Sequence, residues 1–223
     1  MKEHQILALA LAMVLMGWFA PVQADPAPAS AVSCHFSGRA YQTFGADGQG
    51  AGEVAGYFTD IDGISDPLFN GPPSEKTAFF TFRSNQFALT PLAENGSIAL
   101  YRVSPGTFNI YFNPHPNGDW SNPDTFSGDS SFPGNPIAHF MRHESLFYRT
   151  EALGRHDVTE YLVSSKPFIL NGHKYDFKAI APIAVALNET VSNTPASGVT
   201  GLPIVLPLAG NCLAVASEGE EQR

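Results

Sequence analysis

Short stretches in which apolar and polar residues alternate, separated by turn residues, run through most of the chain. The clearest is ENGSIALYRVSPGTFNIYFN, at positions 94–113. Asn95-Gly96 is typical of a tight type I′ hairpin turn, and Ser104-Pro105-Gly106 is a second turn signal. Between these turns successive side chains point to opposite faces, as in a strand. The pattern predicts a three-stranded antiparallel meander whose first strand is the preceding QFALTPL.

Other segments rich in Val, Phe, Tyr and Thr are predicted as strands or hairpins. They are GEVAGYFTDI (52–61), EKTAFFTFRS (75–84), HDVTEYLVSS (156–165) and PFILNGHKYDFKAI (167–180). Gly52 and Gly56 indicate a bulge or a close approach of the backbone. Eight or more short strands predict an all-β fold, with a single antiparallel β-barrel-like or sandwich domain. We favour the barrel, because a meander closes readily and then leaves no exposed edge.

Long loops rich in Pro, Gly and Asn interrupt this pattern at residues 62–75 and 113–135. Loops longer than about 12–15 residues are uncommon unless they are functional or disordered. Trp120, Phe126 and Phe132 indicate that the second loop is packed. We expect this loop to cover one end of the β-structure and to form part of the mouth of a site.

The first 24 residues have the pattern of a secretory signal peptide. Lys2 precedes an apolar run at residues 6–16, which is far shorter than the roughly 20 residues of a membrane span. We expect cleavage near Ala24 and a secreted or periplasmic protein without a membrane span. The expected organisation is a signal peptide (1–24), an N-terminal linker (25–33), a single all-β domain (34–215) and an acidic tail (216–223).

The formal net charge is −9 and basic residues do not cluster, so we expect no nucleic-acid partner. We also expect no cofactor, and the sequence leaves a homo-oligomer open. Cys34 and Cys212 are the two cysteines of the chain, and in an oxidising compartment they predict a disulfide. A buried thiol pair or a metal site is the competing interpretation of these cysteines.

The stretch GNPIAHFMRHESLFYRT, at positions 134–150, is the main candidate for a site. As a strand it places His139, Met141 and His143 on one face, and Arg142 and Glu144 on the other. This face, which also carries Ile137 and Ser145, suits the inside of a ligand-holding barrel. A structural or exposed role of the two histidines is the alternative.

The candidate ligand-binding residues are His139, Met141, His143, Trp120 and Tyr111. The weak catalytic candidates are His139, His143 and Glu144, as acids or bases. A serine nucleophile is not indicated, because GxSxG is absent. Ser164 or Ser165 with His156, Asp157 or His173 is a set that any chain of this size would offer.

No metal site is predicted. Histidines four apart on a strand lie roughly 13 Å from one another, too far to share an ion. Asp60, Asp62, Asp119 and Asp124 are weak calcium candidates, because they lie in loops rich in Asp and Asn but complete no EF-hand.

Seventeen Phe and seven Tyr exceed what a small core needs, and many fall on both faces of the expected strands. A cavity or an interface between subunits would bury them. The first hypothesis is therefore a secreted or periplasmic all-β protein that binds a small, partly apolar ligand in a cavity. The alternatives are a cavity enzyme (isomerase, cyclase or hydrolase) with His/Glu acid–base chemistry, and an extracellular structural or surface component.

Overall fold

The computed structural model describes residues 32–46, 49–128, 135–197 and 203–215. The expected signal peptide, most of the expected linker and the expected acidic tail lie outside these residues. The strands are β1 (Val32–Phe44), β2 (Gly50–Ile61), β3 (Phe80–Ser84), β4 (Phe87–Asn95), β5 (Ile98–Val103), β6 (Gly106–Phe112), β7 (Ala138–Arg142), β8 (Ser145–Arg149), β9 (Leu153–Ser165), β10 (Phe168–Leu170), β11 (His173–Tyr175), β12 (Ala184–Ser192) and β13 (Ile204–Val215). A 3₁₀ turn, η1 (Pro123–Phe126), and a short helix, α2 (Phe177–Ile180), complete the elements.

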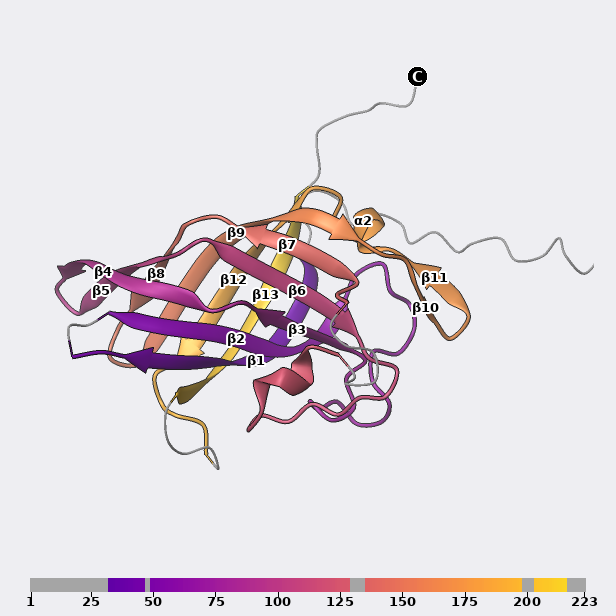
Figure 1. Cartoon of the computed structure of the whole chain (residues 1–223), viewed down its shortest axis with the longest axis horizontal. Helices are drawn as coiled ribbons and strands as arrows, with labels where there is room; N and C mark the ends of the chain where they lie inside the picture. The colour runs from indigo at the N-terminus through magenta and orange to yellow at the C-terminus, as the bar shows by residue number, and fades with distance from the viewer. Residues whose placement is uncertain (1–31, 47–48, 129–134, 198–202, 216–223) are drawn as a thin grey trace, which may run out of the picture.

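The strands close into an eight-stranded antiparallel barrel, as the meander pattern predicted (Figure 1). Strands β1, β2, β9, β12 and β13 each run along the wall as single long strands. The other three positions are each occupied by two shorter strands in succession, namely β3 with β4, β5 with β6 and β7 with β8. Each position pairs with its neighbours in chain order, and β1 pairs with both β2 and β13 to close the ring.

The three divided strands are interrupted side by side, at residues 85–86, 104–105 and 143–144. We call these three pairs of residues the wall seam. Side chains replace part of the backbone ladder there: Asn85 Oδ1 accepts from the backbone N–H of Thr107 at 2.6 Å, and Ser104 Oγ accepts from that of Ala88 at 2.9 Å. Short polar side chains compete with the ladder in this way, which explains why the strands stop here.

The barrel closure carries the predicted disulfide. Cys34 and Cys212 are directly opposite one another in the register of β1 and β13, with their Cα atoms 5.1 Å apart. This spacing lies in the normal range for a disulfide. An intramolecular disulfide is typical of a protein of an oxidising, extracellular or periplasmic environment.

Phenylalanine rings fill the barrel interior. Phe82 packs edge to face against Phe36 and Phe58 at centroid distances of 5.4 Å each, and it stacks on Phe108 at 5.2 Å. Gly56 is required beside these rings, because a Cβ there would lie 2.6 Å from Phe82 Cζ and 2.3 Å from the carbonyl oxygen of Ser37. The close approach expected at Gly56 is therefore present.

Helix α2 packs against the barrel core near the disulfide. Asp176 caps this helix by accepting from the backbone N–H of Lys178 at 2.9 Å, and Phe177 and Ile180 are buried in the core. The C-terminal part of the segment 167–180, which was expected to be strand, is therefore helical. Among the described residues no helix is both long and apolar enough to cross a membrane.

The described part of the loop 113–135 is packed, as expected, but against the outer wall. Phe126 is fully buried there and stacks on Trp120 at a centroid distance of 4.8 Å. Tyr41 and Ala55, from β1 and β2, belong to the same outer cluster, while their sequence neighbours point into the barrel. Phe132 lies outside the described residues.

Candidate functional site

Four ionisable side chains are buried inside the barrel at the level of the wall seam. They are Arg142 on β7, His156 and Glu160 on β9, and Glu189 on β12. Alternation along β9 puts His156 and Glu160 on the inner face together with Val158, and along β12 it puts Glu189 between the inward Leu187 and Val191. Buried charged groups are costly unless paired, so this cluster is the most informative feature of the interior.

Ser145, His156 and Glu189 form a continuous chain of hydrogen-bonding contacts. Ser145 Oγ lies 2.7 Å from His156 Nε2, and His156 Nδ1 lies 3.0 Å from Glu189 Oε2. His156 and Glu189 face each other in the register of β9 and β12, which sets the second contact. Ser145 is half-buried and begins β8 directly after the wall seam, so its hydroxyl is held at the edge of the interruption.

Phe147 supports the orientation of the imidazole. It lies opposite His156 in the register of β8 and β9, with the two rings edge to face at 6.5 Å. Gly154 leaves room for this ring, because a Cβ at that position would lie 2.3 Å from Phe147 Cζ. The imidazole is therefore held between a packed aromatic ring and a carboxylate.

Arg142 and Glu160 are the other charged pair of the interior. They are cross-strand neighbours of β7 and β9, and both are almost fully buried. Nevertheless, Nε and Nη2 of Arg142 and Oε2 of Glu160 make no hydrogen bond to any residue that the structure describes. The guanidinium instead lies over the ring of Phe87, with Cζ 5.0 Å from the ring centroid.

Burial has the largest effect on the pKa values of Glu160 and Arg142. It raises the pKa of Glu160 to about 8, the Arg142 charge opposes that rise, and the charge of Glu189 adds to it. Burial also lowers the pKa of Arg142, against the effect of Glu160 and Glu189. At neutral pH Glu160 is therefore mostly protonated, and strongly shifted carboxyl groups of this kind are enriched at functional sites.

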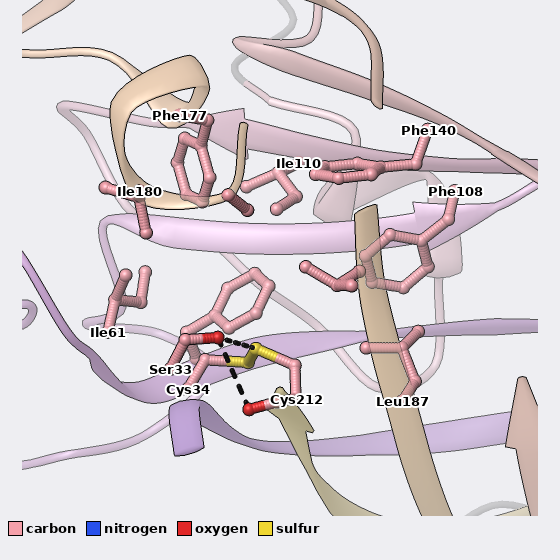
Figure 2. Close-up of a pocket in the computed structure, with 13 residues that line it drawn as sticks. Ser33, Cys34, Ile61, Phe108, Ile110, Phe140, Phe177, Ile180, Leu187 and Cys212 are labelled. Atoms are coloured by element: carbon pink, nitrogen blue, oxygen red, sulfur yellow. Dashed lines mark hydrogen bonds between the residues drawn. A yellow bond between two sulfur atoms is a disulfide. The ribbon is translucent and has the colours of Figure 1, made fainter. Parts of the chain in front are cut away.

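Two interior cavities of the described barrel are small. One, beside His156 and Glu189, is about 20 Å³ and is otherwise lined mainly by apolar side chains such as Phe87 and Val103. Figure 2 shows another of about 20 Å³, where Phe177 and Ile180 face the disulfide across an apolar space. Each has a volume close to that of one water-sized molecule. Neither is large enough for the small ligand that the sequence predicted inside the barrel, and that hypothesis stays a prediction.

The structure places His139 and Met141 on the outer face of β7, and His143, in the wall seam that follows β7, is exposed, so these residues do not face the barrel interior. The alternation is as predicted, but the opposite set of residues points inward: Ala138, Phe140 and Arg142 are buried, whereas 46% of Met141 is exposed. The interpretation went wrong because it assigned the charged face to solvent. His139 contacts Asn109 Oδ1 through Nδ1 at 2.6 Å, and His143 packs edge to face on Tyr161 at 5.0 Å.

The remaining candidate residues are spread over the surface. Glu144 is exposed and lies 3.2 Å from Arg102 Nε. Trp120 belongs to the outer cluster, and Tyr111 is a buried residue on the outer face of β6. Binding roles for these residues stay predictions, and the structure does not bring them together with the histidines.

The four calcium candidates are not gathered at one site, and three of them contact other residues. Asp60 Oδ2 is 3.5 Å from His35 Nδ1, Asp119 accepts from Ser121, and Asp124 pairs with Arg83. Asp62 is exposed. Within the described ranges no group of three or more His, Cys, Asp or Glu side chains has an arrangement that would hold a metal ion.

Sequence reasoning placed Ser145 on the candidate face but gave it no chemical role. It missed Glu189, and it named His156 only among arbitrary combinations. One signal was available: Glu189 occupies an apolar position of the alternating segment AVALNETVS, with Leu187 before it and Val191 after it. A carboxylate at such a position is predicted to be buried and paired. Nothing comparable marks Ser145. No family model, curated protein or solved structure matches this chain, so the candidate site depends on its geometry alone.

Proposed function

We propose that the protein is an exported hydrolase that cleaves small esters by acyl transfer through Ser145. The observation that carries the proposal is the chain of contacts from Ser145 Oγ to His156 Nε2 at 2.7 Å and from His156 Nδ1 to Glu189 Oε2 at 3.0 Å. A hydroxyl, an imidazole and a carboxylate in this order are the components that activate a serine nucleophile. Such a constellation is recognised by geometry and not by sequence order.

In this mechanism Glu189 accepts a hydrogen bond from Nδ1–H of His156, which holds the tautomer whose Nε2 is free to accept the proton of Ser145. Ser145 Oγ attacks the carbonyl carbon of the ester, and His156 then gives the proton to the departing alcohol. Water, deprotonated in turn by His156, attacks the acyl-serine and releases the acid. Glu189 stabilises the imidazolium that forms twice in this cycle.

The half-buried position of Ser145 favours small acyl groups. Its hydroxyl lies at the wall seam, while His156 and Glu189 lie behind it in the barrel. The disulfide and the N-terminal sequence pattern support export of the mature chain after cleavage near Ala24. Binding of a small, partly apolar ligand without chemistry is the second candidate, favoured by the aromatic residues beside the site.

The test is covalent labelling of the purified, exported protein with a fluorophosphonate, read by intact mass and peptide mapping. We expect one adduct, on Ser145, together with hydrolysis of p-nitrophenyl acetate. Ser145→Ala should lose both signals. The matched control is Ser164→Ala, because Ser164 is exposed on β9 and makes no contact with His156. Absence of labelling in the wild type, or equal labelling of Ser145→Ala, would refute the proposal.

A further inference from the structure

An open groove of about 400 Å³ lies on the outer wall of the barrel, apart from the Ser145 contacts. It is lined by Glu53, Arg83, Ser84, Asn85, Gln86, Asn109, Tyr111 and Ser127. These residues come from β2, β3 and β6, from the seam between β3 and β4, and from the residue that follows η1. Its volume is in the range of about 300–1,000 Å³ that is usual for small-molecule sites.

The strand alternation explains why the groove is polar. Glu53, Arg83 and Asn109 are outward positions of strands whose inward neighbours, Val54, Phe82 and Phe108, belong to the core. The seam adds two exposed amides, Asn85 and Gln86. The groove therefore lacks the apolar lining of a site for a hydrophobic ligand.

The one guanidinium that lines the groove, that of Arg83, is paired with carboxylates. Arg83 Nη2 lies 2.9 Å from Glu53 Oε2, and Arg83 also pairs with Asp124. Arg83 further donates from Nη1 to Ser127 Oγ at 3.2 Å. With its one guanidinium already shared between carboxylates, the groove offers little to an anion, and its ion pair leaves no isolated carboxylate for a cation.

The amides are partly held in place. Asn85 Oδ1 accepts from the backbone N–H of Thr107, and Gly106 is needed beside it because a Cβ there would lie 2.3 Å from that oxygen. Asn109 Oδ1 is 2.6 Å from His139 Nδ1. The amide NH₂ of Asn85 remains as a donor, whereas Asn109 also hydrogen-bonds to the side chain of Tyr111. Gln86 is exposed and hydrogen-bonds to no residue among those described, so both ends of its amide are available.

We infer that this groove binds an uncharged, polyhydroxylated ligand, a stretch of neutral oligosaccharide. Such a ligand carries many hydroxyl groups that each donate and accept hydrogen bonds. These groups match the amides, hydroxyls and ion pair that line the groove. The inference does not depend on the proposed hydrolase, because it uses no residue of the Ser145–His156–Glu189 chain.

The experiment is saturation-transfer NMR followed by calorimetry on the mature protein. The probes are five neutral hexasaccharides (malto-, cello-, xylo-, laminari- and N-acetylchitohexaose) and two charged ones (hexagalacturonate and a heparin hexasaccharide). We expect at least one neutral probe to bind, with affinity unchanged from about 0.01 M to about 1 M salt, because screening acts only on charges. Binding of the charged probes alone, or of none of the seven, would overturn the inference.

Variants locate the binding. Gln86→Ala and Asn109→Ala should each weaken the neutral probe about threefold to tenfold, as expected for one lost hydrogen bond. The matched control is Asn211→Ala, an amide on β13 in a different part of the wall. Ser145→Ala should bind the probe as the wild type does, which separates this inference from the proposed function. Unchanged affinity in both groove variants would place the ligand elsewhere and refute the assignment.

Discussion

Glu189 stands directly opposite His156 in the register of β12 and β9, and its Oε2 lies 3.0 Å from the Nδ1 of that histidine. Both side chains are buried, although they are separated by 33 positions in the chain. The barrel therefore presents His156 to Ser145 with one ring nitrogen already occupied, which selects the tautomer that accepts a proton on Nε2.

We predict that Glu189→Gln lowers ester hydrolysis about 1,000-fold or more while the protein stays folded. A glutamine at this position can donate to Nδ1, which favours the tautomer whose Nε2 carries the proton and cannot accept from Ser145. Steady-state rates with p-nitrophenyl acetate measure the effect, and near-UV circular dichroism checks the fold. Glu144→Gln is the control, because Glu144 is exposed and pairs with Arg102. Hydrolysis by Glu189→Gln within about tenfold of the wild type would contradict the role of the carboxylate.

A second prediction distinguishes the catalytic role of His156 from the roles of His139 and His143. His156→Asn should abolish hydrolysis and fluorophosphonate labelling, because it removes the base that contacts Ser145 Oγ. His139→Ala and His143→Ala should retain both, since His139 lies on the outer face of β7 and His143 is exposed in the wall seam. Labelling and rates for the three variants, with melting temperatures alongside, decide the matter. Loss of activity in His143→Ala at an unchanged melting temperature would contradict this assignment and indicate a site on the outer face of the barrel.

A third prediction concerns Glu160 and pH. Its pKa in the folded state is raised to about 8 from its ordinary value of 4.5, mainly by burial. Between these two values the folded protein holds a proton that the unfolded chain has lost, so this group makes the free energy of unfolding fall as pH rises from about 4.5 to about 8. Urea unfolding at pH 5, 7 and 9 should show the fall in the wild type and a smaller fall in Glu160→Gln.

The Arg142→Met variant tests the same pH dependence by changing the charged neighbour of Glu160. The Arg142 charge opposes the rise in the pKa of Glu160, so its removal should raise this pKa further and shift the pH window upward. Carbon-detected NMR titration of the glutamate carboxyl groups reads the shift directly. An identical pH dependence of stability in wild type, Glu160→Gln and Arg142→Met would show that Glu160 holds no proton in the folded state.

The disulfide should contribute substantially to stability. Cys34 and Cys212 are 178 positions apart, so their bond closes nearly the whole described chain into one loop. The chain-entropy model gives about 4–5 kcal/mol for a loop of this size, with smaller values often measured. Urea unfolding of the Cys34→Ala/Cys212→Ala double variant against the oxidised wild type tests this. Two free thiols in the wild type under non-reducing peptide mapping would remove the basis of the prediction.

The sequence by itself determined the all-β class of fold and favoured its closure into a barrel over a sandwich. Alternating residues and tight turns such as Asn95-Gly96 specify strands locally, and a meander of such strands buries its edges by closing. The count and compartment of the cysteines predicted the bond between Cys34 and Cys212, and the register of β1 and β13 places them opposite one another. These features depend on neighbours in sequence or on a simple pairing, so local physical rules are sufficient for them.

Only the tertiary structure decided which face of each strand is the inner one and which residues meet there. Alternation separates Phe140 and Arg142 from His139 and His143, but it does not say which set faces the core, and an arginine buried beside Glu160 reverses the usual assignment. Ser145, His156 and Glu189 are brought together by the registers of β8, β9 and β12. Those registers are set by the packing of the whole barrel, because a shift of one residue would turn each side chain to the opposite face.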